Sequence, residues 1–458
     1  MKKILSAVLA ICYILPLVAH NSTNVKQAVD SSSTLVKNDS ANTVTLSKRG
    51  AKPYLLYNYT AQTGNNPLSQ NFRGDADNRV IVDGNFYSNS KGIPAGFAYN
   101  LLFNRPISEA LINRADKQLG SRLKFEENLN TGITYQHYLK KAGLTLVIGY
   151  NYRQMLNLAA PKQAFETVFY GNSRFEGDTA NLSNIHFDFY NYNQYSLGII
   201  KKVDYGSYQM EMGVTGSFLQ VINNINIQTG NTTIYTAPYG EFININYNLT
   251  YNSATTAAPT YGSLNGVGAS GDFHLAFSNK DKWKLSFDIR DLGIMTFRKH
   301  EVNYSGTNNV NFQGFVIPDL LNFTSATFDT LNLDSALMSK LPAKSNNQYS
   351  VFLPFTANVT FSKPLLNNRL VLTAGVQYRH IPNYYAYAYL KANYFLSPDM
   401  VVSASAGAGG YSLFDLGFEF AKSWKYFDVA IGTSNLIGLI APNYYSGGGL
   451  YLKLGATF

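Results

Sequence analysis

One stretch of the sequence brings together side chains that could support hydrolysis. Ser270, Asp272 and His274 occupy alternate positions, and serine, histidine and aspartate are the members of a nucleophilic triad. In an extended strand such positions lie about 7 Å apart along one face, which is beyond hydrogen-bonding distance. The spacing therefore predicts no triad within this strand, although partners from other strands stay open, and we expect no enzyme.

No motif in the sequence indicates a metal or cofactor site. The six histidines are dispersed without metal-ligand spacing. The sequence holds no Gly-x-Ser-x-Gly elbow, P-loop or zincin motif. The single cysteine, Cys12, lies inside the apolar N-terminal run, so we expect neither a disulfide framework nor thiol catalysis in the exported chain. The sequence predicts no cofactor.

The other residues that could carry chemistry are charged and tyrosine side chains within alternating stretches. We expect the interior of a barrel to be lined by Arg153, Glu211, Asp272, His274, Lys284, Asp288, Arg290, Arg379, Tyr385, Tyr387, Tyr389, Lys391, Asp415, Glu419, Asp428 and Lys453. Acidic and basic members balance, which favours charge pairs that brace the wall over an ion-selective pore. A substrate path along some of them stays open, and the tyrosines would either fill the interior or line a path for an apolar or sugar-like ligand.

The elements that would position these side chains are long strands with a period of two. Leu450, Leu452, Leu454, Ala456 and Phe458 alternate with polar or small residues. Six similar stretches precede them, near 427–432, 414–421, 402–409, 385–394, 370–379 and 351–361. A Lys or Arg facing lipid at mid-membrane costs roughly 2–4 kcal/mol. The charges are therefore expected to face inward and the apolar residues outward.

This pattern predicts a transmembrane antiparallel β-barrel of about 14 strands (14–16), with short helices in long loops or a plug. Weaker strands are expected near 80–88, 95–103, 131–139, 144–153, 194–202, 210–218, 240–251, 272–277 and 283–290. Strand direction does not alternate consistently through 200–262. Helices are expected at 107–119 and 334–341. A soluble β-sandwich would have shorter strands, commonly of five or six residues.

Composition agrees with an exported barrel. Charged residues make up 14% of the chain and aromatic residues another 14%. Lys2 and Lys3 precede an apolar run, which predicts a Sec-type signal peptide at 1–22. We expect a flexible segment or plug at 23–50 and the barrel at 51–458. No later apolar run is long enough for a transmembrane helix, and no dense basic run accompanies the +9 charge, so we expect no nucleic-acid partner.

The chain resembles a known group of membrane proteins. It is similar to uncharacterised outer-membrane barrels of the Bacteroidota, FadL-like and PorV-like in architecture. The resemblance rests on the stretches 285–293, 349–354 and 447–458. It implies a barrel of about 14 strands in the outer membrane of a Gram-negative cell. It also implies that Phe458 is the C-terminal signal read by the barrel-assembly machinery, so outer-membrane lipid and that machinery are the expected partners.

Two functions follow from this resemblance as expectations. The first is a passive conduit for small hydrophobic molecules, by analogy with FadL-like barrels. The second is a structural or docking barrel for secretion or surface-assembly partners, without transport activity.

Overall fold

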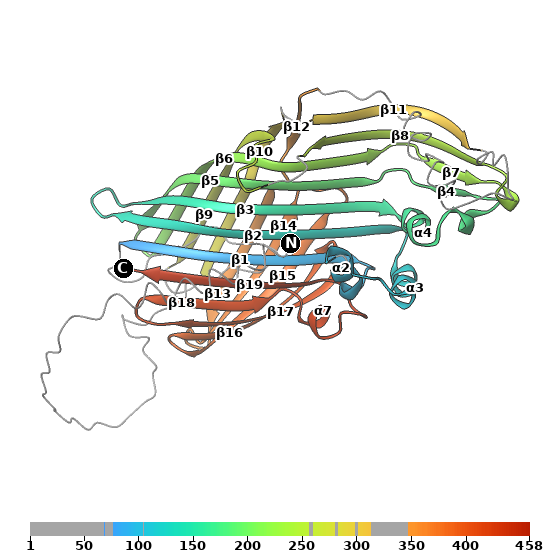
Figure 1. The fold of residues 1–458 in the computed structure, drawn as a ribbon. Helices are drawn as coiled ribbons and strands as arrows, with labels where there is room; N and C mark the ends of the chain where they lie inside the picture. Colours follow the sequence, from blue (N-terminus) through green and yellow to red (C-terminus); the bar gives the residue numbers. More distant parts are fainter. Residues whose placement is uncertain are drawn as a thin grey trace, which may run out of the picture.

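The computed structural model describes residues 68, 77–103, 105–255, 260–279, 283–297, 301–312 and 347–458. Long strands dominate these residues and run side by side around one wall (Figure 1). Three predicted segments lie outside the described residues, namely the signal peptide at 1–22, the flexible or plugging segment at 23–50, and the helix at 334–341.

Fourteen antiparallel strands form a closed barrel, as predicted. In order around the wall they are β1 (Asn78–Lys91), β2 (Arg122–Leu139), β3 (Leu144–Pro161), β5 (His186–Tyr205), β6 (Tyr208–Thr229), β9 (Gly266–Asn279), β10 (Trp283–Phe297), β13 (Thr356–Leu365), β14 (Leu370–Arg379), β15 (Tyr385–Ser397), β16 (Met400–Gly410), β17 (Ser412–Ser423), β18 (Phe427–Thr433) and β19 (Gly448–Thr457). The first strand pairs with the last from Arg79↔Thr457 to Ser88↔Gly448. This closure removes the free edges that an open sheet would expose.

Side chains alternate between the two faces of the wall. In β19, Leu450 is exposed on the outside whereas Tyr451 is buried inside. Phe273 and His274 on β9 show the same alternation. Since neighbouring residues of a strand point to opposite faces, the period of two in the sequence becomes an apolar exterior and a polar interior.

Five further strands are described besides these fourteen. They are β4 (Thr179–Asn181), β7 (Thr233–Thr236), β8 (Ile243–Ala254), β11 (Glu301–Phe312) and β12 (Tyr349–Phe352). β8 pairs with both β6 and β11, and β7 pairs with β8 and β4. Together with the end of β6, the strands β4, β7, β8 and β11 form a sheet that projects beyond the barrel, away from the C-terminus (Figure 1). β12 instead pairs with β10 of the wall.

The long strand β6 explains why strand direction was inconsistent in the sequence. Its residues from Tyr208 to Val221 pair with β9, whereas those from Asn224 to Thr229 pair with β8. The strand predicted near 240–251 is therefore a strand of the projecting sheet, and its placement in the wall was wrong. β6 also continues to Thr229, well beyond the strand predicted near 210–218.

Short helices cover part of the end from which the sheet projects. α2 (Ala95–Leu102) replaces the strand predicted near 95–103, and it follows Pro94, which favours a helix start. α3 (Glu109–Gln118) lies inside the predicted helix, and its N-cap Ser108 accepts a hydrogen bond from the Leu111 amide. The other helical segments are α4 (Lys162–Tyr170), α7 (Leu436–Ile440), η2 (Asn172–Phe175) and η3 (Pro238–Gly240).

These helices pack over the wall through apolar side chains. Phe97 of α2 lies against Phe165 and Phe169 of α4, with ring centroids 5.8 and 5.2 Å away. Leu111 of α3 and Leu123 of β2 belong to the same buried cluster. None of the helices in the described ranges is long and apolar enough to cross a membrane.

The strand predicted at 351–361 is broken in two. β12 ends at Phe352 and β13 begins at Thr356. Pro354 lies in the break, where its missing N–H cannot take part in a strand ladder. The alternation changes phase there, so Leu353 is buried in an apolar cluster whereas Phe352 is exposed. Leu353 therefore does not belong to the apolar outer face that the alternation of 351–361 predicted.

The two ends of the barrel differ. Asn78 and Phe458 lie together, and each donates its backbone N–H to the carbonyl oxygen of the other. The connections at this end are short, for example between β5 and β6 and between β15 and β16. The projecting sheet and the helices lie at the opposite end (Figure 1).

Candidate functional site in the barrel interior

The structure buries nearly all the side chains that the sequence assigned to the interior. Glu211, His274, Asp288, Arg290, Arg379, Tyr387, Tyr389, Lys391, Asp415, Glu419, Asp428 and Lys453 are buried. Arg153, Asp272 and Lys284 are partly buried. Tyr385 differs, because it is 65% exposed at the mouth. Its ring lies 3.9 Å from the Nζ of Lys124 on β2, which is itself buried.

A β-bulge in β10 creates the central charge pair. The register with β9 shifts between Ile289 and Leu292, and both Arg290 and Asp291 are buried. Asp291 has φ 61°, a left-handed conformation that aspartate tolerates better than most residues. The bulge turns its carboxylate inward, where Oδ2 accepts a hydrogen bond from Arg153 Nη1 of β3 at 2.5 Å.

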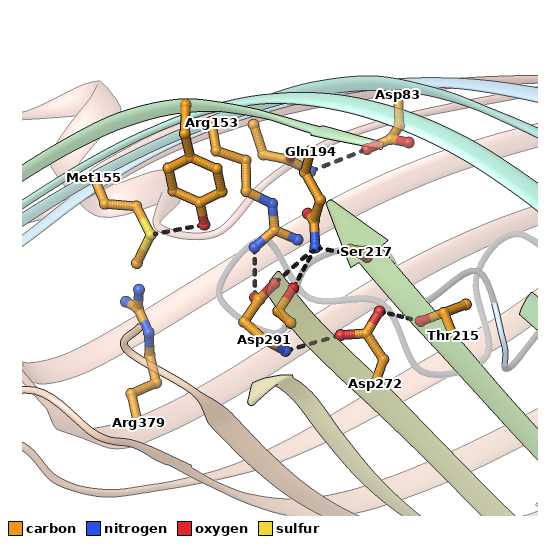
Figure 2. A network of polar contacts seen from close by, with 12 residues as sticks. Asp83, Arg153, Met155, Gln194, Thr215, Ser217, Asp272, Asp291 and Arg379 are labelled. Carbon is orange, nitrogen blue, oxygen red and sulfur yellow. Dashed lines mark hydrogen bonds and ion pairs between the residues drawn. The ribbon is translucent and has the colours of Figure 1, made fainter. Parts of the chain in front are cut away.

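The pair extends into a network that joins five strands, β3, β5, β6, β9 and β10 (Figure 2). Gln194 of β5 donates to Asp291 Oδ1 and to Ser270 Oγ, at 3.2 and 3.3 Å. The Asp291 amide donates to Asp272 Oδ1 of β9 at 2.8 Å, and Thr215 of β6 donates to Asp272 Oδ2 at 2.6 Å. The two carboxylates are thus held by neutral donors and one arginine.

A second pair spans the interior between distant strands. Arg379 of β14 donates to Glu126 Oε2 of β2 and, at 2.7 Å, to the Tyr87 hydroxyl of β1. Glu126 also accepts from Asn89 Nδ2 at 3.2 Å. β2 and β14 are not neighbours in the wall, so this pair braces the barrel across its interior.

The space between the two pairs is small. A cavity of about 40 Å³ lies between Arg153, Asp291 and Arg379, with Tyr87 and Arg290 also in its lining. A cavity needs at least about 10–15 Å³ to hold one water molecule. This space therefore has room for ordered water and is lined by polar groups that would bind it.

His274 is held between two carboxylates nearer the short-turn end. Its Nδ1 lies 2.5 Å from Asp288 Oδ1, and its Nε2 lies 3.0 Å from Glu211 Oε1. Lys202 lies 3.1 Å from the other Glu211 oxygen, and Lys284 lies 3.9 Å from Oε1. An imidazole can donate from both nitrogens only when it is protonated, so this setting suits a charged histidine.

Further pairs line the opposite side of the interior. Lys391 of β15 lies 3.0 Å from Glu419 of β17, which also accepts from the Tyr451 hydroxyl. Arg79 of β1 lies 3.7 Å from Asp428 of β18. These contacts join charges of opposite sign, so they are charge pairs of the kind that the sequence favoured.

Two remaining predicted residues have local partners. Asp415 accepts hydrogen bonds from Ser412 at 2.7 Å and from Asn435 at 3.1 Å. Lys453 lies opposite Asp83 in the register of β19 with β1.

Tyrosine rings fill the interior between β14 and β16. Tyr389 lies over Gly375 of β14, and Tyr387 lies over Gly407 of β16. The two rings stack with centroids 5.8 Å apart. Glycine is required beneath them, because a Cβ atom at either position would overlap a phenol ring.

Tyr384 also lies inside. It packs near Tyr411 in the same buried cluster. The phase changes at the irregular start of β15, where the register with β16 shifts between Tyr385 and Ala388.

One described residue before β1 also lies inside the barrel. Leu68 is fully buried, and it packs with Val147 of β3 and Ile200 of β5. A Cβ atom at Gly213 of β6 would lie 3.0 Å from the Leu68 Cβ atom. Leu68 therefore occupies the space that Gly213 leaves on the inner face, close to the short-turn end.

Sequence reasoning missed several interior residues, among them Asp291 and Glu126. Adjacent charges break the alternation at Arg290 and Asp291, and such a break is a signal for a bulge. The alternation of β2 is obscured by the neighbouring pair Glu126 and Glu127. The polar residues Asn128 and Asn130, at the same spacing as Glu126, could have extended that strand backward.

The geometry does not assemble a catalytic triad from the residues considered. Ser270 accepts from Gln194, Asp272 binds Thr215 and the Asp291 amide, and His274 binds Asp288 and Glu211. In the described ranges, no group of three or more His, Cys, Asp or Glu side chains is arranged to hold a metal ion.

Comparisons with known proteins give one family and distant structural likenesses. Residues 76–434 match the model of a family of unknown function, DUF5723. The comparison with curated protein sequences finds no match.

Among solved structures, the chain is similar to a Pseudomonas aeruginosa FadL homologue, with 10% identity and a TM-score of 0.43, over 90% of this chain and 96% of that one. It is similar to the Ralstonia pickettii toluene transporter TbuX, with 8% identity and a TM-score of 0.42, over 86% and 92%. A third likeness is to the translocator domain of the Neisseria meningitidis autotransporter NalP, with 9% identity and a TM-score of 0.32, over 84% and 90%. Likenesses this distant say nothing of what this chain does.

Proposed function

Since the chain belongs to DUF5723, a family of unknown function, we propose its function from its own geometry: it is an outer-membrane β-barrel, closed at rest, that serves as a structural and docking barrel. The observation that carries this proposal is the buried interior, which is braced by charge pairs across the barrel.

The outer surface supports the membrane location. Large apolar side chains alternate along the wall strands and are exposed. They include Ile133, Ile148, Leu197, Ile199, Val214, Phe218, Phe273, Phe277, Phe287, Ile289, Val359, Phe361, Val376, Leu390, Phe418, Phe420, Ile431 and Leu450. A water-facing surface rarely exposes apolar patches beyond a few hundred Å². A belt around a closed barrel is what the hydrocarbon layer of a membrane requires.

Strand length agrees with this location. A strand that crosses the bilayer at a tilt needs about 9–11 residues. Most wall strands reach or exceed this length, from 10 residues in β14 to 22 in β6. The exported, outer-membrane location is thus our proposal from the belt, the strand lengths and the barrel closure together.

The interior supports the closed state. Thr373, Gln377 and Ser286 face inward and have no exposed area, and Arg379 and Lys391 are buried as well. A water-filled channel would leave such side chains accessible. Opening a path past Arg379 or Arg153 would separate a buried ion pair, and removing one partner of such a pair costs about 3–5 kcal/mol.

A conduit for small hydrophobic molecules is the second candidate. An apolar cluster on the inner face, away from the short-turn end, favours it, and its members include Met155, Leu219, Met295 and Phe297. A molecule that entered there would next meet the charged network around Asp291. The conduit therefore requires that this network rearrange, whereas the docking barrel requires no change.

Conductance and uptake separate the two candidates. In planar bilayers we expect the purified wild-type barrel to show no steady channel, whereas Arg379→Ala, which removes the brace to Glu126, should conduct. Arg105→Ala, at an exposed arginine outside the wall strands, is the matched control and should stay silent. Steady conductance of the wild-type barrel, or faster naphthalene uptake by cells that carry it than by cells that lack it, would reject the closed docking barrel.

A further inference from the structure

The projecting sheet has one face made of amide and hydroxyl side chains. β8 and β11 are paired so that Asn246 lies opposite Asn309, Asn248 opposite Thr307, and Thr250 opposite Ser305. The alternate positions, such as Ile245 and Val310, carry mostly apolar and aromatic side chains on the other face. Polar groups from neighbouring strands therefore gather on one surface, which we call the amide face, although the other face also carries Asn308 and Ser253.

A groove of about 470 Å³ lies on the amide face. Its lining is mostly amide and hydroxyl residues, with one tyrosine, and consists of Asn231, Thr233, Asn246, Tyr247, Asn248, Thr307, Asn308 and Asn309. Asn246, Asn248, Thr307 and Asn309 are exposed. Its volume falls within the range of small-ligand sites, about 300–1,000 Å³.

The groove carries no charged side chain in its lining. A charged ligand would lose hydration there without gaining an opposite charge. An apolar ligand would cover amide groups without giving them partners, which leaves buried donors and acceptors unsatisfied. The lining therefore fits a ligand that is uncharged and rich in groups that both donate and accept hydrogen bonds.

Hydrogen bonds within the protein leave donors and acceptors of the groove available to a ligand. Asn309 Nδ2 donates to Asn246 Oδ1. Each side-chain amide has one acceptor oxygen and two donor hydrogens. Within the described residues this bond leaves the Asn246 Nδ2 group to donate and the Asn309 Oδ1 atom to accept. A sugar hydroxyl can accept from the first and donate to the second.

A peptide strand fits this face less well. Strand addition uses the backbone at the edge of a sheet, and pockets for alternate side chains give it specificity. The groove instead presents residues of three strands, most of them with amide or hydroxyl side chains, away from the edge of the sheet. Carbohydrate matches this arrangement, because its hydroxyl groups bind to side chains across a surface.

We propose that the groove on the amide face binds a neutral oligosaccharide or polysaccharide. This inference rests on the proposed docking function and names its partner. The two can fail separately: conductance of the wild-type barrel rejects the closed state without affecting saccharide binding, whereas loss of saccharide binding leaves the silent barrel unchanged.

Two variants test the groove while preserving its structure. Asn246→Asp keeps the oxygen that accepts from Asn309 and adds a negative charge. Thr307→Val removes a hydroxyl at nearly constant volume. Asn113→Asp is the matched control, because Asn113 is exposed on α3 and its side-chain oxygen accepts from the Tyr170 hydroxyl, a bond that aspartate can also accept.

The full-length barrel in detergent is applied to an array of neutral gluco-, galacto-, manno- and fuco-oligosaccharides, with oligogalacturonate and a random peptide set as further arms. We expect binding to at least one neutral saccharide, weakened about tenfold or more by Asn246→Asp and by Thr307→Val, and unchanged by Asn113→Asp. Heat-modifiable gel mobility confirms that each variant is folded. Absence of neutral saccharide binding, preference for the acidic or peptide arm, or equal binding by folded Asn246→Asp would overturn the proposal.

Discussion

Arg153 on β3 and Asp291 on β10 meet inside the barrel, 2.5 Å apart, although 138 residues separate them in sequence. The contact depends on the bulge that turns Asp291 inward. The two strands are separated in the wall by β5, β6 and β9, so the pair fixes the distance between strands that do not pair with each other. Its partners Gln194 and Asp272 extend that constraint to β5 and β9.

Asp291→Asn tests how much this pair stabilises the barrel. Asparagine tolerates the left-handed backbone at φ 61°, so the variant removes charge without adding backbone strain. Arg153 is then left largely buried without its counter-ion, and we expect a loss of about 3–5 kcal/mol in the free energy of unfolding. Urea titration of the barrel in lipid, followed by gel mobility, measures it.

The control for this variant is Asp77→Asn, which removes the partner of Lys140 in an exposed pair 2.7 Å long. Exposed pairs contribute about 0–1 kcal/mol. Equal losses in the free energy of unfolding for Asp77→Asn and Asp291→Asn would show that burial of the Arg153 pair does not increase its contribution to stability.

Gly375→Ala tests the packing of tyrosine over glycine. A methyl group at this position would overlap the ring of Tyr389, so the ring or the wall must move. We expect a loss of about 1–3 kcal/mol, as is usual for overpacked interiors. Thermal unfolding followed by the loss of near-ultraviolet circular dichroism reports it.

Gly216→Ala is the matched control, because nothing lies within 4 Å of a Cβ atom built there. It should leave the unfolding temperature within a degree or two of wild type or raise it slightly. If Gly375→Ala behaved in the same way, the Tyr389 ring would not lie over β14.

A designed disulfide tests the place of Leu68. The only cysteine of the chain is Cys12, so the variant Leu68→Cys, Gly213→Cys with Cys12→Ser offers one pair of thiols. The Cβ atoms would be 3.0 Å apart, slightly closer than the usual 3.5–4.5 Å of disulfides. We expect copper-catalysed oxidation to join them within the folded barrel, seen as faster migration of the denatured, unreduced chain.

The control pairs Leu68→Cys with Gly216→Cys, since residue 216 is exposed on β6. No intramolecular bond is expected there. Equal oxidation of both pairs, or of neither, would contradict a fixed position of Leu68 on the inner face.

Asp116 makes the stability of α3 and its contacts with α4 dependent on pH. Partial burial acts to raise the pKa of this carboxyl group, but hydrogen bonds from Lys162 and Arg174 outweigh it and hold the pKa below the usual value. A carboxyl group with a lowered folded pKa stabilises the fold above its unfolded pKa, about 3.9. That contribution is lost as the pH falls through the folded pKa.

Hydrogen exchange of the α3 amides, corrected for the intrinsic rate at each pH, measures this effect. We expect protection to fall below about pH 4 in the wild type, and to depend less on pH in Asp116→Asn. The effect should be modest, no more than about 1 kcal/mol, because Arg174 is partly exposed. Identical pH profiles for both proteins would exclude Asp116 as the titrating group.

The sequence by itself determined that the chain forms a barrel wall and which of its faces is apolar. Its alternation in 370–379 and 450–458 predicted which side chains face outward, because residue spacing in a strand assigns each side chain to one of two faces. The barrel of about 14 strands followed from the same pattern, and the structure confirms it. The balance of acidic and basic residues also predicted charge pairs, and Lys391 and Glu419 form one.

Only the tertiary structure decided which charges meet and where the pattern is interrupted. Arg379 reaches Glu126 across the interior, and Arg153 reaches Asp291, because closure of the sheet brings together residues that share no local signal. The bulge at Asp291 and the break at Pro354 change the phase of alternation by a local shift of the backbone. The projecting sheet arises because β6 changes partner beyond Val221, and strand pairing depends on contacts that a local period of two does not encode.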